Sequence, residues 1–118
     1  MESEIGRYFE GRLLETQKMM RATYDLAMGT AKDVVVWIDG RELVFGKGEP
    51  RQGRGFLRVI PGEVRIVLAF PNAPSLYDPK KVLKGPKGSQ ASISIGYVAE
   101  LDTYLRRLVE QASSLDSE

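Results

Sequence analysis

The sequence predicts an α+β fold, in which an antiparallel four- to five-stranded sheet carries the N-terminal and C-terminal helices packed on one face. Two hairpin signals predict the sheet, because Asp39-Gly40 and Pro61-Gly62 each separate two runs rich in β-branched and aromatic residues. The order of the elements is the third observation. It does not alternate strand with helix, which disfavours a doubly wound parallel sheet.

The first helix is expected over residues 3–29. Apolar residues, Leu13 among them, recur there at intervals of three to four, the spacing of one buried helical face. Gly11 lowers helix propensity by about 1 kcal/mol relative to Ala, so we expect a kink or a break at this residue. Gly29 is placed to end the helix.

The middle of the chain is expected to form two hairpins, with strands over residues 34–38, 41–45, 55–60 and 63–70. The last strand alternates with period two, which predicts Val64, Ile66, Leu68 and Phe70 on one buried face and leaves the other face partly wet. Trp37 is expected in the core, where its indole N–H needs an acceptor.

A long connection with four prolines is expected over residues 71–89, and loops of this length tend to be functional or mobile. Residues 91–95 alternate and predict a short edge strand, and residues 98–113 predict a final amphipathic helix. Residues 114–118 are a polar tail that we expect to be disordered. The length suits a single domain, residues 1–118.

The chain contains no cysteine and no histidine. This excludes disulfides, thiolate metal sites, Ser-His and Cys-His pairs and the usual zinc and non-haem iron ligand sets. Acid–base chemistry by a carboxylate or a lysine stays open, as does calcium or magnesium binding through carboxylates. We therefore assign no catalytic residue, no metal ligand and no cofactor. The acidic start and the short apolar runs predict no signal peptide, no membrane contact and a cytoplasmic location.

The charges of the chain are unevenly distributed although the net charge is only +1. The region 47–88 holds nine basic and three acidic residues. This excess is compatible with a surface that binds anions or nucleic acid, and also with an ordinary solvated face. The solvated face is the favoured interpretation. The glycines and lysines of residues 84–89 lack the spacing of a phosphate-binding loop. The candidate anion ligands are Arg51, Arg54, Arg58, Arg65, Lys80, Lys81, Lys84 and Lys87.

The first helix also offers a soft apolar surface, formed by Met19, Met20, Tyr24 and Met28. Methionine adapts its shape to a partner, so these residues are the candidate partner interface. Ordinary packing against the sheet is the preferred interpretation, because one apolar stripe is typical of any core-facing helix.

The order of three segments resembles a family of small uncharacterised bacterial domains, some of which are labelled predicted transport proteins. These segments are Trp37 to Leu43, Gly55 to Val59, and the helix ELDTYLRRLVEQA that ends at Ala112. The resemblance covers residues 22–113. It implies an α+β fold and no established activity, so no functional residue is carried over. Members often have a His in the last strand, whereas Ser92-Ile93-Ser94-Ile95 has none, which argues against a His-dependent role here.

Three functions follow as hypotheses. The first is a non-catalytic binding or assembly module that associates with a protein partner or with itself as a homodimer. The second is nucleic-acid or phosphate-ligand binding through the basic region 47–88, whose affinity falls steeply with salt. The third is a histidine-free enzyme with a carboxylate or lysine base in a cleft under the 71–89 connection.

Overall fold

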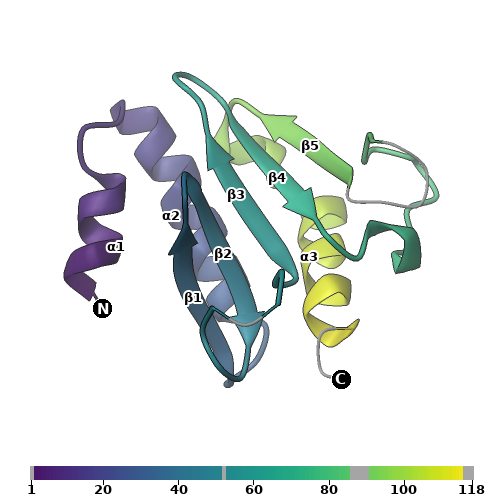
Figure 1. The fold of residues 1–118 in the computed structure, drawn as a ribbon. Coiled ribbons are helices and arrows are strands. Elements are labelled where there is room, and N and C mark those ends of the chain that lie inside the picture. The colour runs from purple at the N-terminus through teal and green to yellow at the C-terminus, as the bar shows by residue number, and fades with distance from the viewer. Residues whose placement is uncertain (1, 52, 86–90, 116–118) are drawn as a thin grey trace.

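A five-stranded antiparallel sheet forms the centre of the protein, and its strands follow one another in chain order (Figure 1). The structure is a computed structural model that describes residues 2–51, 53–85 and 91–115. Each strand pairs with the next along the chain, so the sheet is a simple meander. The strands are β1 (Val34–Asp39), β2 (Glu42–Lys47), β3 (Leu57–Pro61), β4 (Ile66–Phe70) and β5 (Ala91–Ile95).

The helices α2 (Leu14–Met28) and α3 (Thr103–Leu115) lie on the same face of the sheet, which confirms the predicted α+β architecture (Figure 1). The expected first helix is broken, because α1 (Glu2–Phe9) precedes α2 as a separate helix. Gly11 lies in the break with φ +80°, a backbone angle that favours glycine, so the predicted interruption at this residue is confirmed.

The C-terminal segment differs from the prediction at both ends of its helix. Residues 98–100 form the 3₁₀ helix η2 (Val98–Glu100), and α3 begins only at Thr103. The Asp102 carboxylate accepts a hydrogen bond from the backbone N–H of Leu105 at 3.0 Å, which stabilises the start of α3. Because α3 continues to Leu115, the expected disorder from residue 114 is wrong for 114–115, and 116–118 lie outside the described residues.

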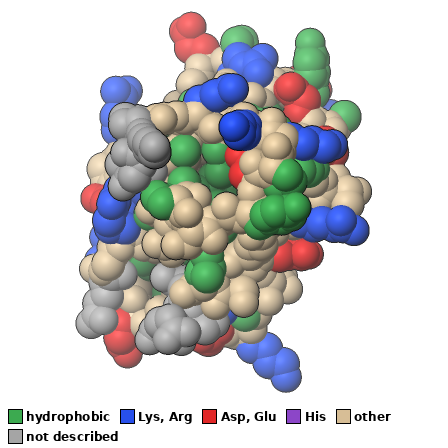
Figure 2. Space-filling view, turned by 90° about the vertical axis from the view of Figure 1, so that its right-hand side faces the viewer, with side chains coloured by type: hydrophobic (Ala, Val, Ile, Leu, Met, Phe, Trp, Pro, Cys, Tyr) green, Lys and Arg blue, Asp and Glu red, His purple; other side chains and the backbone are tan. Residues whose placement is uncertain are grey.

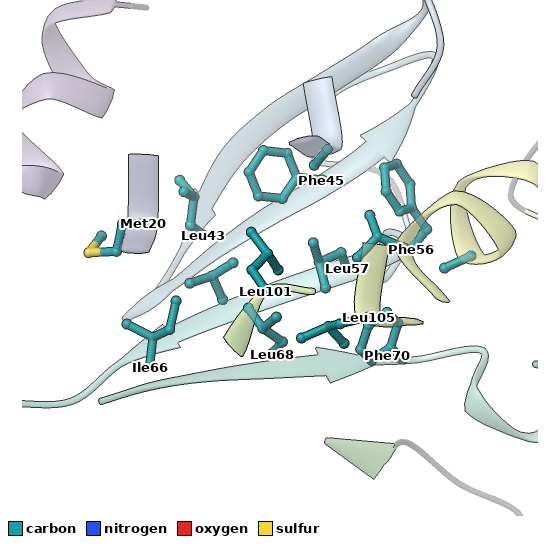
Figure 3. Packing of buried hydrophobic residues seen from close by; sticks show 14 of the residues in the cluster. Met20, Leu43, Phe45, Phe56, Leu57, Ile66, Leu68, Phe70, Leu101 and Leu105 are labelled. Carbon is teal, nitrogen blue, oxygen red and sulfur yellow. The ribbon is translucent and has the colours of Figure 1, made fainter. Parts of the chain in front are cut away.

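The core lies between the sheet and the two helices (Figure 3). Alternate side chains of β2, β3 and β4 point toward it, as the period of two requires. Full burial of one such side chain contributes roughly 1.5–3 kcal/mol. The fully buried members from these strands are Leu43, Phe45, Leu57, Val59, Ile66, Leu68 and Phe70.

The prediction for Val64 is wrong, because its side chain is 63% exposed. The backbone N–H of Gly62 donates to the Arg65 carbonyl at 2.7 Å, so this turn continues to residue 65 and β4 begins only at Ile66. Ile66, Leu68 and Phe70 lie in the core as predicted, and Ala69 on the opposite face is buried as well. Val64 therefore projects from the end of the β3–β4 hairpin and not into the core.

Trp37 is buried, but it lies on the face of the sheet that the helices do not cover. Its neighbour Val36 belongs to the core beneath the helices, so Trp37 points to the opposite face. The indole ring lies so close over Gly46 that a Cβ there would sit 2.9 Å from it, and the Cα of Gly55 lies over the same residue. Two glycines thus make room for the tryptophan and for the loop that enters β3.

Replacement of Gly55 by alanine is expected to destabilise the fold more than replacement of Gly48. Both residues have positive φ, which costs an alanine roughly 1–2 kcal/mol. A Cβ on Gly55 would also lie 2.5 Å from the Phe45 carbonyl oxygen, adding about 1–3 kcal/mol of overpacking, whereas Gly48 has open space. Urea unfolding of both variants measures the difference. Equal losses would contradict the close approach at Gly55.

Candidate functional site

The predicted anion ligands belong to three separate segments of the fold. Arg51 and Arg54 lie in the loop before β3 and Arg58 lies in β3, while Arg65 lies in the turn before β4. The connection between β4 and β5 carries the described lysines of the set, Lys80, Lys81 and Lys84, and Lys87 lies outside the described residues.

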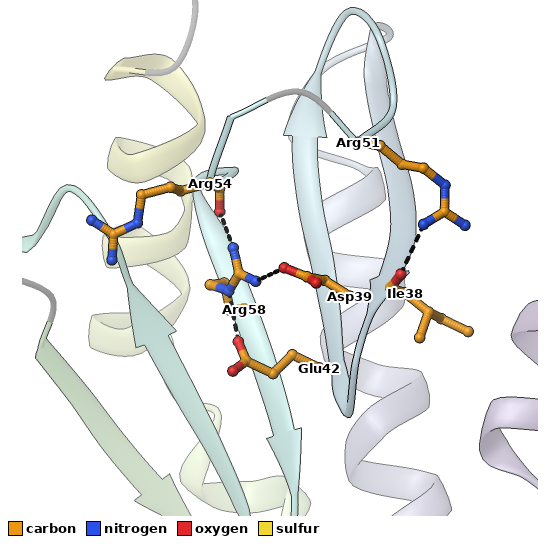
Figure 4. A network of polar contacts seen from close by, with 6 residues as sticks. All are labelled: Ile38, Asp39, Glu42, Arg51, Arg54 and Arg58. Atoms are coloured by element: carbon orange, nitrogen blue, oxygen red, sulfur yellow. Dashed lines mark hydrogen bonds and ion pairs between the residues drawn. The ribbon is translucent and has the colours of Figure 1, made fainter.

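Arg58 is held by two carboxylates on the face of the sheet away from the helices (Figure 4). Its Nη2 lies 2.5 Å from Asp39 and its Nε lies 2.6 Å from Glu42, while Nη1 donates to the Arg54 carbonyl at 2.9 Å. Burial acts to lower the pKa of the guanidinium, but the hydrogen bonds to Glu42 and Asp39 raise it. With its side chain only 12% exposed and its nitrogens occupied, Arg58 covers the sheet and is not available to an anion.

The other arginines of the set also bond within the chain. Arg65 donates to the Ser94 hydroxyl at 2.8 Å and to the Ser94 carbonyl at 3.1 Å, and it lies 4.0 Å from the Glu100 carboxylate. Arg51 donates to the Ile38 carbonyl at 3.1 Å. Each guanidinium is therefore turned toward its own sheet or loop, and the structure does not bring Arg51, Arg58 and Arg65 together in one cavity.

The connection between β4 and β5 is tied down to α3 at its middle. The Asp78 carboxylate accepts hydrogen bonds from the Tyr104 hydroxyl at 2.5 Å and from the backbone N–H groups of Val82 and Leu83 at 3.2 and 3.0 Å. The Tyr104 hydroxyl accepts in turn from the backbone N–H of Lys80 at 3.0 Å. Four apolar side chains of the connection also pack on the core: Ala73, Leu76, Val82 and Leu83.

Figure 2 shows the side of the molecule on which β5 and this connection lie. Lys and Arg side chains stand around a hollow there, and apolar side chains are visible inside it. A pocket of about 100 Å³ on this side is lined by residues of the connection, β5 and α3, including Lys80, Ile93 and Tyr104. Its volume falls well below the roughly 300–1,000 Å³ of small-molecule sites.

The Asp78 carboxyl, which bonds to Tyr104 of this pocket, is not poised to act as a general base. Burial acts to raise the pKa of the Asp78 carboxyl, but the hydrogen bonds from Tyr104, Leu83 and Val82 together hold that pKa below its usual value. A general base at neutral pH needs the opposite shift. Among the described residues, no three Asp or Glu side chains come together in a group that could hold a metal ion.

The pKa of Asp78 predicts a loss of stability in acid. Because the pKa is lower in the folded chain than the roughly 3.9 of an unfolded aspartate, the stabilisation is present above about pH 4 and is lost as the pH falls through the folded pKa. Asp78→Asn removes this titration, so its free energy of unfolding is expected to change less between about pH 5 and about pH 2.5 than that of the wild type. Urea unfolding at each pH measures it.

The matched control is Asp25→Asn, which alters an exposed aspartate on α2. This variant is expected to keep the acid sensitivity of the wild type. If Asp78→Asn lost as much free energy of unfolding between about pH 5 and about pH 2.5 as the wild type, the Asp78 carboxylate would not be what holds the connection to α3.

The candidate partner residues on α2 face the core. Met19 and Met20 are 1% and 0% exposed. Tyr24 is half-buried, with its ring edge-on to Phe9 and Phe45 at centroid distances of 6.3 and 5.9 Å, and Met28 is half-buried against the same cluster. This placement agrees with core packing, the interpretation preferred from the sequence.

Three turns meet at one end of the molecule (Figure 1). A groove of about 600 Å³ lies between the α1–α2 turn, the β1–β2 turn and the β3–β4 turn. We call it the turn groove, and it is lined by Gly11, Arg12, Leu13, Arg41, Pro61, Gly62, Glu63 and Val64. Leu13 and Val64 are 57% and 63% exposed, and Leu14, the first residue of α2, is 66% exposed.

The walls of the turn groove are held by hydrogen bonds between distant parts of the chain. The buried Thr16 hydroxyl donates to the Glu63 carbonyl at 3.1 Å and ties α2 to the β3–β4 turn. The Tyr8 hydroxyl donates to the Arg41 carbonyl at 2.7 Å and ties α1 to the β1–β2 turn. Burial is the largest of the effects that raise the pKa of Tyr8 to about 12, and Glu42 adds to it, so the phenol stays protonated and keeps its donor.

The sequence does not indicate this groove, because its apolar spacing predicts Leu13 and Val64 on buried faces. In both cases the apolar spacing continues into a turn, where the backbone changes direction. Gly11 was the available signal for the first turn, and the adjoining Pro61-Gly62 pair was the signal for the second.

Comparison of the chain with protein-family models, with curated proteins and with solved structures finds no match. The resemblance to the bacterial domain family thus stays a prediction. Among the described residues, no helix combines the length and the apolar character needed to cross a membrane.

Proposed function

We propose that this chain is a non-catalytic binding module that holds a protein partner in the turn groove. The observation that supports this most is the exposure of Leu13 and Val64, which both line the groove. Leu14, the next residue in the chain after Leu13, is exposed as well. Scattered apolar residues are normal on a protein surface, but aliphatic side chains gathered in a groove with charged neighbours are typical of interaction sites. A cytoplasmic location is part of the proposal.

The groove is also preorganised for binding. The hydrogen bonds of Thr16 and Tyr8 fix two of its walls before any partner arrives. Less conformational entropy is then lost on association, and more of the burial of the aliphatic side chains contributes to affinity. A mobile surface of the same composition would bind more weakly.

The two alternative functions have less support. A nucleic-acid surface needs free cations on one face, whereas Arg58 and Arg65 donate to groups of their own chain. A histidine-free enzyme needs a cleft with a carboxyl or lysine of suitably shifted pKa, whereas the pKa of Asp78 is lowered and the connection above it packs on the core.

Photo-cross-linking in the cells that produce the chain tests the proposal. With p-benzoylphenylalanine in place of Val64, we expect a cross-linked protein, because position 64 lines the groove. Leu14→Asp in the same chain is expected to abolish the product, since burying an unpaired carboxylate at an interface is costly. Electrophoresis and mass spectrometry measure the product and its mass.

The matched control carries the same cross-linker in place of Tyr77, which is 75% exposed on the connection between β4 and β5. We expect no specific product from this position. No product from position 64, or a product that persists with Leu14→Asp, would overturn the proposed binding site.

A further inference from the structure

We propose that the occupant of the turn groove is a second copy of this chain, seated across a two-fold axis. This inference rests on the proposed function and names its partner. A two-fold interface brings the same surface patch of both protomers together, so the patch must be complementary to itself. The turn groove meets this condition in its apolar part and in its charges.

Of the described residues that line the groove, three are charged. Arg12 is turned toward Tyr8, because its Nε donates to the Tyr8 carbonyl at 2.9 Å and its guanidinium lies over the Tyr8 ring. The other two charges, of opposite sign, have no ion-pair partner in the described chain. Arg41 comes from the β1–β2 turn and Glu63 from the β3–β4 turn, and both line the groove. Their backbone carbonyls are occupied by Tyr8 and Thr16, which holds both residues in place while leaving the charged ends exposed.

A two-fold axis through the groove pairs Arg41 of one protomer with Glu63 of the other, twice. The same axis lays Leu13, Leu14 and Val64 of one protomer against the equivalent side chains of its partner, which removes exposed aliphatic surface from water. A uniformly acidic partner would instead set a like charge against Glu63, and a uniformly basic partner would set a like charge against Arg41, which disfavours association.

The net charge of the chain also favours a second copy. It is only +1, so two copies repel each other little as they approach.

Sedimentation of two charge-reversal variants tests the inference. Wild type is expected to be a monomer at a protein concentration of about 1 µM and a dimer at about 1 mM, as for a weakly associating pair. Arg41→Glu places acidic charges at both 41 and 63, and Glu63→Arg places basic charges at both, so in each variant alone the two positions that would pair carry like charges and the dimer is expected to be at least about tenfold weaker. An equimolar mixture is expected to regain the dimer, because each acidic groove then meets a basic one.

The control is Arg107→Glu, which reverses an exposed charge on α3 and is expected to leave the dimer unchanged. Wild type that stays monomeric, or a dimer that both groove reversals leave intact, would overturn the self-pairing. The mass of the position-64 cross-link separates the two proposals. A product of twice 13.2 kDa supports both, a product of another mass keeps the binding site and overturns the second copy, and no product overturns both.

Discussion

The hydrogen bond from the Thr16 hydroxyl to the Glu63 carbonyl joins the start of α2 to the end of the β3–β4 hairpin. Thr16 is 1% exposed, so its hydroxyl has little access to water. Loss of the hydrogen bond would therefore leave a buried polar group without a partner, which is destabilising. The bond spans 47 positions of the chain and adds to the packing of α2 on the sheet. Its acceptor residue, Glu63, lines the turn groove next to Val64.

The two faces of the sheet are closed by different means. Two helices bury an apolar core on one face. On the other face, the Trp37 ring packs over Gly46, and Arg58 bridges Asp39 and Glu42. Arg58, from the basic region, is therefore used in closing the fold, whereas Leu13 and Val64 remain exposed in the turn groove.

The sequence was sufficient to predict the fold class, the order of the elements, the break at Gly11 and the alternation from Ile66 to Phe70, because each depends on local spacing or turn chemistry. It was not sufficient to locate the turn groove. Val64 continues the period of its strand, and only the turn that runs on to Arg65 directs it to solvent. Likewise, no local pattern shows that Arg58 meets carboxylates 16 and 19 residues away.

The central claim is that exposed aliphatic side chains of the turn groove contact a second copy of the chain. Isotope-filtered nuclear Overhauser spectra of a mixture of labelled and unlabelled protein test this claim directly, because they detect only contacts between different molecules. We expect intermolecular contacts from the methyl groups of Leu13, Leu14 and Val64, and none from Leu115, which is 40% exposed on α3. Intermolecular contacts that arise at Leu115 or elsewhere, with none at the groove, would contradict the account.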